Sequence, residues 1–426
     1  MGKIQSQIII ITAALLAVSC SRQTMSVEEL RVEHMENPYV VDATHPRLSW
    51  INVPKSQKAR GIKQTAYRIV VASSMENLKQ GIYDLWDSGK QLSEESDLIS
   101  YQGKTLPSAQ DCYWKVQTWD QDGKPTAWSK PSYWGMGLMN EDEWRAQWIA
   151  PLLGGPGAPL LRKHFDSKGQ IKQAKVFVCG LGYFELYVNG ERIGDDYLVP
   201  NMTDYTKRFD LEKGPIAISG NMSRHRVMYL AYDITKQIQE GRNALGVILG
   251  NGFYDAVNLN IPCSKFGDEC LRLQLQLTYA DGTTQTVISD NTWETKPSAI
   301  TLNGVHAGEI YNANLETPLW ATTEDNSQGW QRAKCIEGPT GMMTAHTAPT
   351  DKIVETLKPI SLHQREDGAW VVDFGKEISG WLHLHDLKGE KGDTVKVDYI
   401  SESVQGNMRY VMNGSGSEDY APRFTW

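Results

Sequence analysis

The sequence has little phenylalanine and little cysteine. Its 426 residues include 8 Phe and 6 Cys, against 14 Trp, 18 Tyr and 37 Gly. Trp and Tyr rings carry a polar group, so their excess over Phe favours half-exposed aromatic surfaces. The many glycines indicate many turns. We assign most of the rings to the cores of small β-domains and the rest to platforms for polar ligands such as sugars.

A surplus of positive charge is also absent. The chain has 43 Lys and Arg against 51 Asp and Glu, a net charge of −8 at pH 7. Without a basic field to hold a phosphate backbone, nucleic acid is excluded as a main partner. A content of 40% hydrophobic and 22% charged residues is ordinary for a globular protein and argues against wholesale disorder. The length predicts about three domains.

Long apolar runs are missing after the N-terminus. The run at 8–18 (IIIITAALLAV) is too short for a permanent membrane helix and is typical of a signal peptide. Residues 16–20 (LAVSC) resemble a bacterial lipobox, in which the cysteine becomes the lipidated first residue. We predict a signal peptide over residues 1–20 and lipidation of Cys20. The protein would then be a cell-envelope lipoprotein, periplasmic or on the cell surface, held at the outer or cytoplasmic membrane. An ordinary secretory signal is the alternative.

The other five cysteines form no CxxC pair, which excludes a zinc ribbon. Cys263 and Cys270 are close enough for a loop disulfide in an oxidising compartment. Two unpaired thiols are an equal alternative.

Strand patterns dominate the chain, and we predict an all-β protein built from tandem β-sandwiches. Residues 26–137 alternate strands with turns and carry Trp on strands, which is typical of a fibronectin type III-like sandwich. We expect Trp114, Trp119 and Trp128 in its core. Residues 144–335 predict a jelly roll, with alternating strands at 183–188 and 271–277. Residues 343–426 predict a further β-sandwich, and 235–240 contain the only indication of a helix.

Common catalytic motifs are missing. There is no Gly-rich phosphate loop, no HExxH and no GxSxG, and no carboxylate stands in a context that marks it as catalytic. His383 and His385 are two residues apart on a predicted strand, so they point to the same face. They could hold a metal ion. A solvated pair of side chains is the favoured interpretation.

Polar residues in Gly-rich turns at strand ends are the feature that packing explains least. A sugar site pairs amides or carboxylates with a ring, because hydroxyls take polar contacts and the apolar sugar face lies on the ring. Carboxylates and carbonyls in such loops could also hold calcium, and turn geometry alone is the competing explanation. The predicted sugar-binding residues are Asn189, Asp195, Asn251, Gly252, Tyr254, Glu309 and Tyr311.

An ordered series of short motifs resembles the N-terminal modules of bacterial α-L-rhamnosidases, glycoside hydrolase family 78. The series spans about 380 residues and is specific as a set, although each motif is weak alone. It runs PRLSW (46–50), WDSG (86–89), YWKV (113–116), LRKHF (161–165), GLGYFELYVNG (180–190), YDIT (232–235), LGNGFY (249–254), GEIY (308–311) and DFG (373–375).

The resemblance implies a fibronectin-like domain, a jelly-roll sugar-recognition domain and a further β-sandwich. In the family an (α/α)₆ barrel follows, and it holds the acids that hydrolyse terminal α-L-rhamnose with inversion. The segment YAPRFTW (420–426) resembles the one that continues into that barrel. We therefore expect no catalytic residue and no activity in this chain alone, and no required cofactor.

In some members of this family, related jelly rolls bind L-rhamnose with calcium. If that holds here, the loops near Asn189, Asp195 and Asn251 are the predicted place, and rhamnose-containing glycans are the predicted partners. Two hypotheses follow from different classes of protein. One is the non-catalytic part of an α-L-rhamnosidase, and the other is a carbohydrate-binding surface lipoprotein without hydrolase activity.

Overall fold

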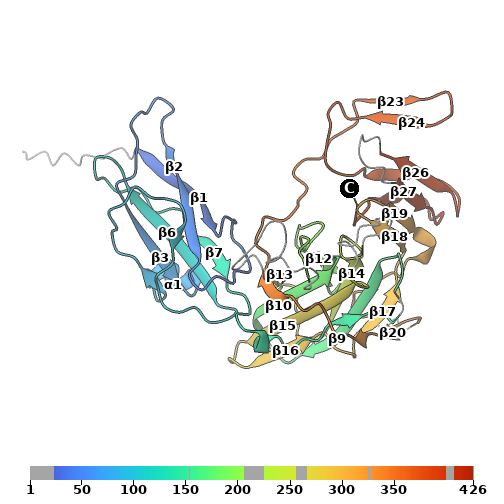
Figure 1. The fold of residues 1–426 in the computed structure, drawn as a ribbon, viewed down its shortest axis with the longest axis horizontal. Coiled ribbons are helices and arrows are strands. Elements are labelled where there is room, and N and C mark those ends of the chain that lie inside the picture. Colours follow the sequence, from blue (N-terminus) through green and yellow to red (C-terminus); the bar gives the residue numbers. More distant parts are fainter. Residues whose placement is uncertain are drawn as a thin grey trace, which may run out of the picture.

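The computed structural model describes residues 24–152, 154–205, 225–255, 266–324, 328–399 and 407–425. These residues form an N-terminal sandwich (residues 25–135), a central sandwich (strands between 149 and 345) and a C-terminal region (residues 353–425), seen in this order along the chain in Figure 1. Nearly all regular elements are strands, which confirms the predicted all-β fold class. No helix in the described part of the chain is long and apolar enough to cross a membrane.

The N-terminal sandwich consists of two antiparallel sheets around one core. The first contains β1 (Met25–Val32), β2 (Arg47–Pro54) and β5 (Ile99–Ser100). The second has the order β4 (Trp86–Asp87), β3 (Ala66–Ala72), β6 (Asp111–Trp119), β7 (Ser132–Gly135). Trp50, Trp114 and Trp134 are buried between the sheets. Burying such large rings is what lets a small domain hold together.

Two of the three tryptophans predicted for this core lie outside it. Strand β6 alternates strictly between half-buried and buried side chains, so Trp114 points inward. Trp119 is five residues away and therefore points to the other face, where Lys90 Nζ lies 4.6 Å from its ring centroid. Trp128 is also only half-buried, with Lys115 Nζ 5.0 Å from its ring. The prediction was correct for Trp114 and wrong for Trp119, whereas Trp128 packs against a smaller buried cluster formed by Val70, Ala72 and Leu78.

The predicted helix at 235–240 is instead a turn. The amide of Asn243 accepts a hydrogen bond from Gln239 N at 2.9 Å and donates to Gln239 O at 2.7 Å. These bonds satisfy backbone groups that a helix would pair internally. The described α-helix is α1 (Met75–Gln80), which begins after the N-cap Ser74 and ends at Gly81 in the left-handed conformation.

The central sandwich packs two larger sheets face to face (Figure 1). One has the order β21 (Lys334–Cys335), β8 (Ile149–Ala150), β15 (Cys270–Tyr279), β10 (Ile171–Leu181), β13 (Arg226–Asp233), β22 (Met342–Ala345), and β16 (Thr284–Ile288) also pairs with β15. The other has the order β12 (Glu191–Ile193), β11 (Tyr183–Val188), β14 (Gly241–Gly250), β9 (Pro159–Ser167), β17 (Glu294–Pro297), β20 (Gln331–Arg332).

The core of the central sandwich comes from alternate residues on both sheets. Leu273 and Leu275 of β15 meet Leu186 and Val247 of the opposite sheet, and all four are almost wholly buried. Because β15 is paired on both sides, by β10 and by β16, its backbone groups are satisfied within the sheet. This sandwich is the rigid frame that positions the polar site described below.

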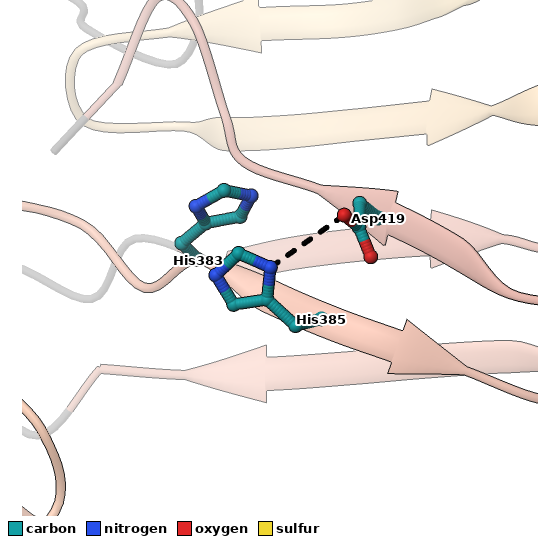
Figure 2. A group of neighbouring side chains, drawn as sticks. All are labelled: His383, His385 and Asp419. Carbon is teal, nitrogen blue, oxygen red and sulfur yellow. Dashed lines mark ion pairs between the residues drawn. The ribbon is translucent and has the colours of Figure 1, made fainter.

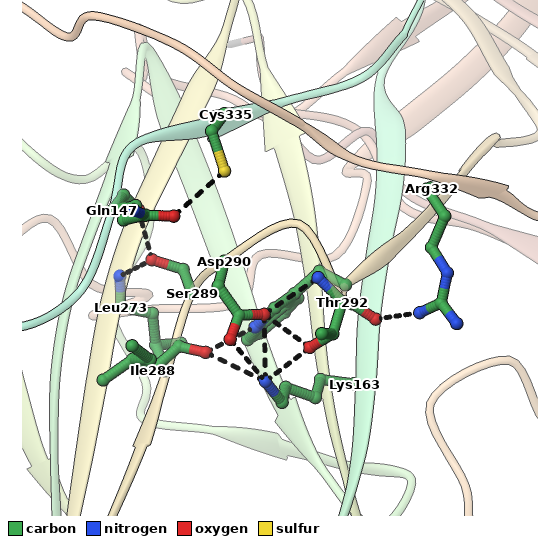
Figure 3. A network of polar contacts seen from close by, with 10 residues as sticks. Gln147, Lys163, Leu273, Ile288, Ser289, Asp290, Thr292, Arg332 and Cys335 are labelled. Atoms are coloured by element: carbon green, nitrogen blue, oxygen red, sulfur yellow. Dashed lines mark hydrogen bonds and ion pairs between the residues drawn. The ribbon is translucent and has the colours of Figure 1, made fainter.

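A polar network connects strand β9 of one central sheet to the loop that follows β16 of the other (Figure 3). Lys163 Nζ on β9 contacts Asp290 Oδ1 at 3.1 Å and Thr292 Oγ1 at 2.7 Å, both in the loop between β16 and β17. Burial alone would raise the pKa of Asp290, but hydrogen bonds from Thr292 and Lys163 hold it below its ordinary value. The loop is thereby tied to β9.

The C-terminal region shares a sheet with residues much earlier in the chain. The hairpin β18 (Ile300–Gly304) and β19 (Gly308–Asn312) lies beside β27 (Asn407–Val411), followed by β26 (Thr394–Asp398). The β19–β27 pairing is parallel. Two smaller pairs are β23 (Ser361–Gln364) with β24 (Trp370–Asp373), and β25 (Leu384–Leu387) with β28 (Glu418–Tyr420).

The described cysteines are free thiols: Cys112, Cys179 and Cys270 are buried and Cys335 is exposed. Burial raises the pKa of the Cys270 thiol to about 12, although a hydrogen bond with Tyr254 opposes part of that rise. Cys263, its predicted disulfide partner, lies outside the described residues, as does Cys20.

Candidate functional site

A pocket of about 280 Å³ lies on the central sandwich, where β9, β11 and β14 meet the hairpin β18–β19 and the C-terminal segment 420–425. Its walls come from seven separate stretches of the chain, of which residues 316–320 are the longest. The lining residues are Leu160, Tyr187, Ile248, Ser298, Ala299, Ile300, Tyr311, Glu316, Thr317, Pro318, Leu319, Trp320 and Arg423.

Aromatic rings form one wall of the pocket. Tyr187 and Trp320 pack edge to face, with ring centroids 5.2 Å apart, and both are half-buried. Tyr311 is half-buried as well, and its hydroxyl donates to Glu316 Oε1 at 2.7 Å. Partly exposed rings beside hydroxyl and carboxylate groups offer both an apolar surface and polar partners to a ligand.

A charged network lies beneath these rings. Arg423 Nη1 donates to Tyr187 Oη at 2.7 Å and to Glu185, while Tyr187 Oη donates to Glu185 Oε2 at 2.8 Å. Arg192 forms a second ion pair with Glu185 Oε1, at 3.2 Å. Burial raises the pKa of Glu185, but Arg423 and Arg192 outweigh it and hold that pKa below its ordinary value. Glu185 is therefore ionised at neutral pH.

The strand pattern explains how a charged residue comes to lie there. On β11, Phe184, Leu186 and Val188 belong to the core of the sandwich. Side chains alternate along a strand, so Glu185 and Tyr187 must point to the opposite face. The sequence shows this second face as Tyr183, Glu185 and Tyr187 at alternate positions. Its partner Arg423 was not identifiable, because it lies 238 positions away along the chain.

Glu309, a predicted sugar-binding residue, is fully buried at the base of this region. Its carboxylate accepts hydrogen bonds from Tyr420 Oη at 2.7 Å, Arg423 N at 3.0 Å and Phe424 N at 3.2 Å. Burial raises the pKa of Glu309, and these three donors oppose that rise. Glu309 thus holds the segment that carries Arg423, whereas Tyr311, two residues later, lines the pocket.

The motif at 250–252 is explained by close backbone contacts. A side chain on Gly250 would come within 2.4 Å of the ring of Phe424, so glycine lets that ring pack on β14. Gly252 has a positive φ of 52°, which glycine adopts without strain. Asn251 is fully buried; its backbone N–H donates to Asn303 Oδ1 at 2.8 Å, and its side-chain amide has no hydrogen-bond partner in the described part of the chain.

Two further predicted residues take part in packing and turn geometry. Tyr254 is buried against Tyr205 and Phe266, with ring centroids 5.1 and 5.8 Å away. Asn189 has a positive φ of 50° in the turn after β11. The Asn189 amide accepts from Ala244 N at 2.8 Å and donates to Gln237 O at 2.8 Å.

The structure does not bring all the predicted site residues together. Tyr183 pairs with Gly250 and Val188 with Leu245, so Asn251 and Asn189 follow opposite ends of the β11–β14 ladder. At about 3.3 Å per residue these ends are roughly 17–20 Å apart. Asp195 is elsewhere again, exposed and paired with Lys352.

The loops predicted to hold calcium do not converge on one ion site. The side-chain oxygen of Asn189 already accepts from Ala244 N on β14, and Lys352 lowers the pKa of Asp195 through a hydrogen bond and its charge. In the described residues, one group of three or more His, Cys, Asp or Glu side chains is close enough to share an ion. It consists of His383, His385 and Asp419, so it includes neither Asp195 nor a neighbour of Asn251. Calcium binding at these loops stays a prediction.

Three family models match successive parts of the chain. The Rha78A-like, N-terminal immunoglobulin domain matches residues 27–140. The alpha-L-rhamnosidase N-terminal domain matches 169–216 and 221–355, and the bacterial alpha-L-rhamnosidase concanavalin-like domain matches 363–426. The chain belongs to the bacterial α-L-rhamnosidase family. The resemblance seen in the sequence motifs is thereby confirmed.

Relatives and solved structures agree with this family membership. An alpha-L-rhamnosidase of Formosa agariphila is 30% identical over 97% of this chain and 47% of its own length. The structure of an alpha-L-rhamnosidase from Dictyoglumus thermophilum matches 94% of this chain and 46% of that one, with a TM-score of 0.79 and 33% identity. A Streptomyces avermitilis alpha-L-rhamnosidase, solved in complex with L-rhamnose, shares the fold with a TM-score of 0.79, 22% identity, and coverage of 94% and 55%. The chain spans about half the length of the relatives it matches.

Proposed function

We propose that this chain is the non-catalytic N-terminal part of an α-L-rhamnosidase, an enzyme that hydrolyses terminal α-L-rhamnose from glycans. The observation that carries the proposal is the uninterrupted order of three rhamnosidase family models along the chain. The match to a rhamnosidase structure at 33% identity adds to it. The role of this chain in such an enzyme is to form its β-sandwich modules.

The chemistry of the reaction supports a non-catalytic role for these modules. Inverting hydrolysis needs one carboxylic acid to protonate the leaving oxygen and a second carboxylate, about 6.5–9.5 Å away, to activate water. The pocket lined by Tyr187 and Arg423 has one carboxylate in its wall, Glu316. A larger pocket beside Trp148 and Arg272 also has one, Glu141, which is paired with Arg272 at 2.8 Å.

A direct assay tests whether the chain alone is inactive. The purified chain and the Formosa agariphila relative would be incubated in parallel with an aryl α-L-rhamnoside. We expect release of the aryl group by the relative and none by the chain. Turnover by the chain at a comparable rate would contradict its assignment as non-catalytic.

A chimera tests whether the chain belongs to a rhamnosidase in function as well as in sequence. The chain would replace the matching 46% of the Dictyoglumus thermophilum enzyme, whose remaining part is left unchanged. We expect a soluble chimera that cleaves the same aryl rhamnoside, with the remaining part alone as the control. A folded chimera without activity would argue against functional equivalence.

The pocket favours a second function, the binding of a carbohydrate such as L-rhamnose. Its two packed rings and the Arg423 guanidinium provide the stacking surface and the polar donor that sugar recognition uses. Calorimetry with L-rhamnose, with and without calcium, measures this binding. We expect Trp320→Ala to remove the heat of binding and Trp370→Ala, which alters an exposed ring on β24, to leave it unchanged. Equal binding by both variants would exclude this pocket.

We also propose that Cys20 carries a lipid anchor that holds the protein in the cell envelope. The basis is the apolar run at 8–18 followed by LAVSC. Labelling of the expressed protein with a radioactive fatty acid tests the anchor, with Cys20→Ala as the control. Label in the variant would contradict lipidation at Cys20.

A further inference from the structure

A separate cluster of ionisable side chains lies on the C-terminal region, outside the lining of both pockets. His383, His385 and Asp419 are all exposed, and one nitrogen or oxygen atom from each lies within 4.8 Å of the other two (Figure 2). No other group of three or more His, Cys, Asp or Glu side chains in the described residues has this geometry.

Strand geometry accounts for the convergence. His383 precedes β25 and His385 lies on it, so their positions i and i+2 point to one face. On the neighbouring strand β28, Glu418 and Tyr420 are buried and Asp419 points outward between them. The antiparallel register pairs Leu384 with Tyr420, which places Asp419 beside the two imidazoles.

The carboxylate of Asp419 is held in orientation by its neighbours. Its Oδ1 accepts a hydrogen bond from Asp386 N at 2.9 Å, and the Asp386 carboxylate in turn accepts from Ser417 Oγ at 2.5 Å. Asp386 has a positive φ of 55° at an irregularity in the pairing of β25 with β28. The second oxygen, Oδ2, faces His385 Nδ1 at 3.5 Å. Metal ligands are commonly oriented by such outer contacts.

We propose that His383, His385 and Asp419 form a binding site for a divalent transition-metal ion of the Zn²⁺ type. Imidazole nitrogens with one carboxylate suit such ions, whereas calcium prefers oxygen ligands throughout. In a tetrahedral zinc site with bonds of about 2.0–2.1 Å, ligand atoms are roughly 3.4 Å apart. The three atoms lie within 4.8 Å of one another, so the two exposed imidazoles would need to move slightly toward the carboxylate to reach that spacing. Water would complete the coordination.

An ion at this site would tie β25 to β28 on their exposed side. The buried side of β28 already connects the region to the hairpin β18–β19, because Tyr420 Oη donates to Glu309. The metal would therefore stabilise the strand that leads to Arg423 of the pocket. The proposal of a metal site does not depend on whether the chain takes part in hydrolysis or binds a sugar.

Titration calorimetry of the untagged, metal-free chain with ZnCl₂ tests the proposal, and CaCl₂ is the comparison ion. We expect one Zn²⁺ per chain, no calcium binding at this site, and a higher thermal unfolding midpoint with zinc. His385→Ala and Asp419→Asn should each raise the zinc Kd at least about 10-fold, since even outer contacts of metal ligands contribute that much.

His363→Ala is the matched control, because His363 is an exposed histidine on β23 of the same region. It should leave the zinc Kd unchanged, and circular dichroism of each metal-free variant checks that its fold is intact. Absence of zinc binding, or an unchanged Kd in folded His385→Ala, would overturn the proposal. Equal losses in His363→Ala and His385→Ala would overturn it too, because they would indicate non-specific binding.

Discussion

Strand β15 of the central sandwich and the pair β23–β24 of the C-terminal region both contain large apolar residues, but only β15 buries them. β15 alternates Leu with polar residues, and Leu271, Leu273, Leu275 and Leu277 have no exposed surface. β23 and β24 also carry large apolar residues, yet Leu362 and Trp370 are each 60% exposed. β15 has strands on both sides and a second sheet over it, whereas β23 and β24 pair only with one another.

The contrast teaches that strand formation and burial are separate outcomes. Alternation and β-branched or aromatic residues are local properties, and they predict a strand in both places. An isolated two-stranded hairpin is at most marginally stable in water. The stability of the described chain should therefore depend on β15 and its neighbours far more than on β23 and β24.

The largest expected effect is a truncation in the buried sheet. Leu275→Ala removes a fully buried side chain from the core between the two central sheets and should lower the free energy of unfolding by about 3–4 kcal/mol. Urea denaturation followed by circular dichroism measures it, with the half-exposed Gln276→Ala as control. Similar small losses in both variants would mean that the core is not packed as described.

The second effect concerns the connection between the two regions. Glu309→Ala leaves the Tyr420 hydroxyl and two backbone N–H groups without their acceptor, so we expect a loss of about 3 kcal/mol. Glu316→Ala removes an exposed acceptor of Tyr311 and should cost less than about 1 kcal/mol. If urea denaturation gives equal values for the two, the C-terminal segment is not held through Glu309.

The third effect is a pH dependence at the beginning of β15. Burial, and then the nearby charges of Asp255 and Asp268, raise the pKa of Glu269 from 4.5 to about 8. The folded state therefore keeps a proton that the unfolded state loses between about pH 4.5 and 8. Each unit of pH rise in that range lowers stability by at most about 1.4 kcal/mol, which is less than either effect above.

The substitution Glu269→Gln keeps the shape and removes the titration. Urea midpoints at pH 5, 6, 7 and 8 should diverge between the wild type and the variant, with the variant gaining as pH rises. Parallel profiles would show that Glu269 has the same proton affinity in the folded and unfolded states.

The smallest expected effect is on the exposed pair of strands. Leu362→Ala should change the free energy of unfolding by less than about 0.5 kcal/mol, because the side chain is 60% exposed and has little burial to lose. The same urea titration measures it. A loss of 2 kcal/mol or more would reveal that this face is covered in solution and would remove the contrast with β15.

Much of the fold could be predicted from local patterns. The alternation of β6 and β15 and the Gly-containing turns identify strands, and the ordered motifs identify the family. The tryptophan assignments failed where that alternation was not applied residue by residue, as Trp119 shows. The segment predicted as a helix is a turn at 235–237, and just after it the nearby amide of Asn243 bonds to the backbone of Gln239.

The pocket was less accessible to such reasoning. Of the predicted residues Tyr311 lines it, while Glu309 and Asn251 are buried and Asn189 lies in the turn directly after β11. Asn, Asp and Gly occur both in turns that need a special backbone conformation and in loops that contact a ligand. Composition at strand ends therefore does not distinguish the two roles.

The sequence by itself determined which segments are strands, where they turn and to which family the chain belongs, because these follow from contacts between near neighbours and from ordered motifs. Only the tertiary structure decided that Arg423 pairs with Glu185 across 238 positions, that Phe424 covers Gly250, and that Asp419 meets His383 and His385. Such pairings depend on sheet order and register, and these are set by the packing of whole sheets rather than by any local run of residues.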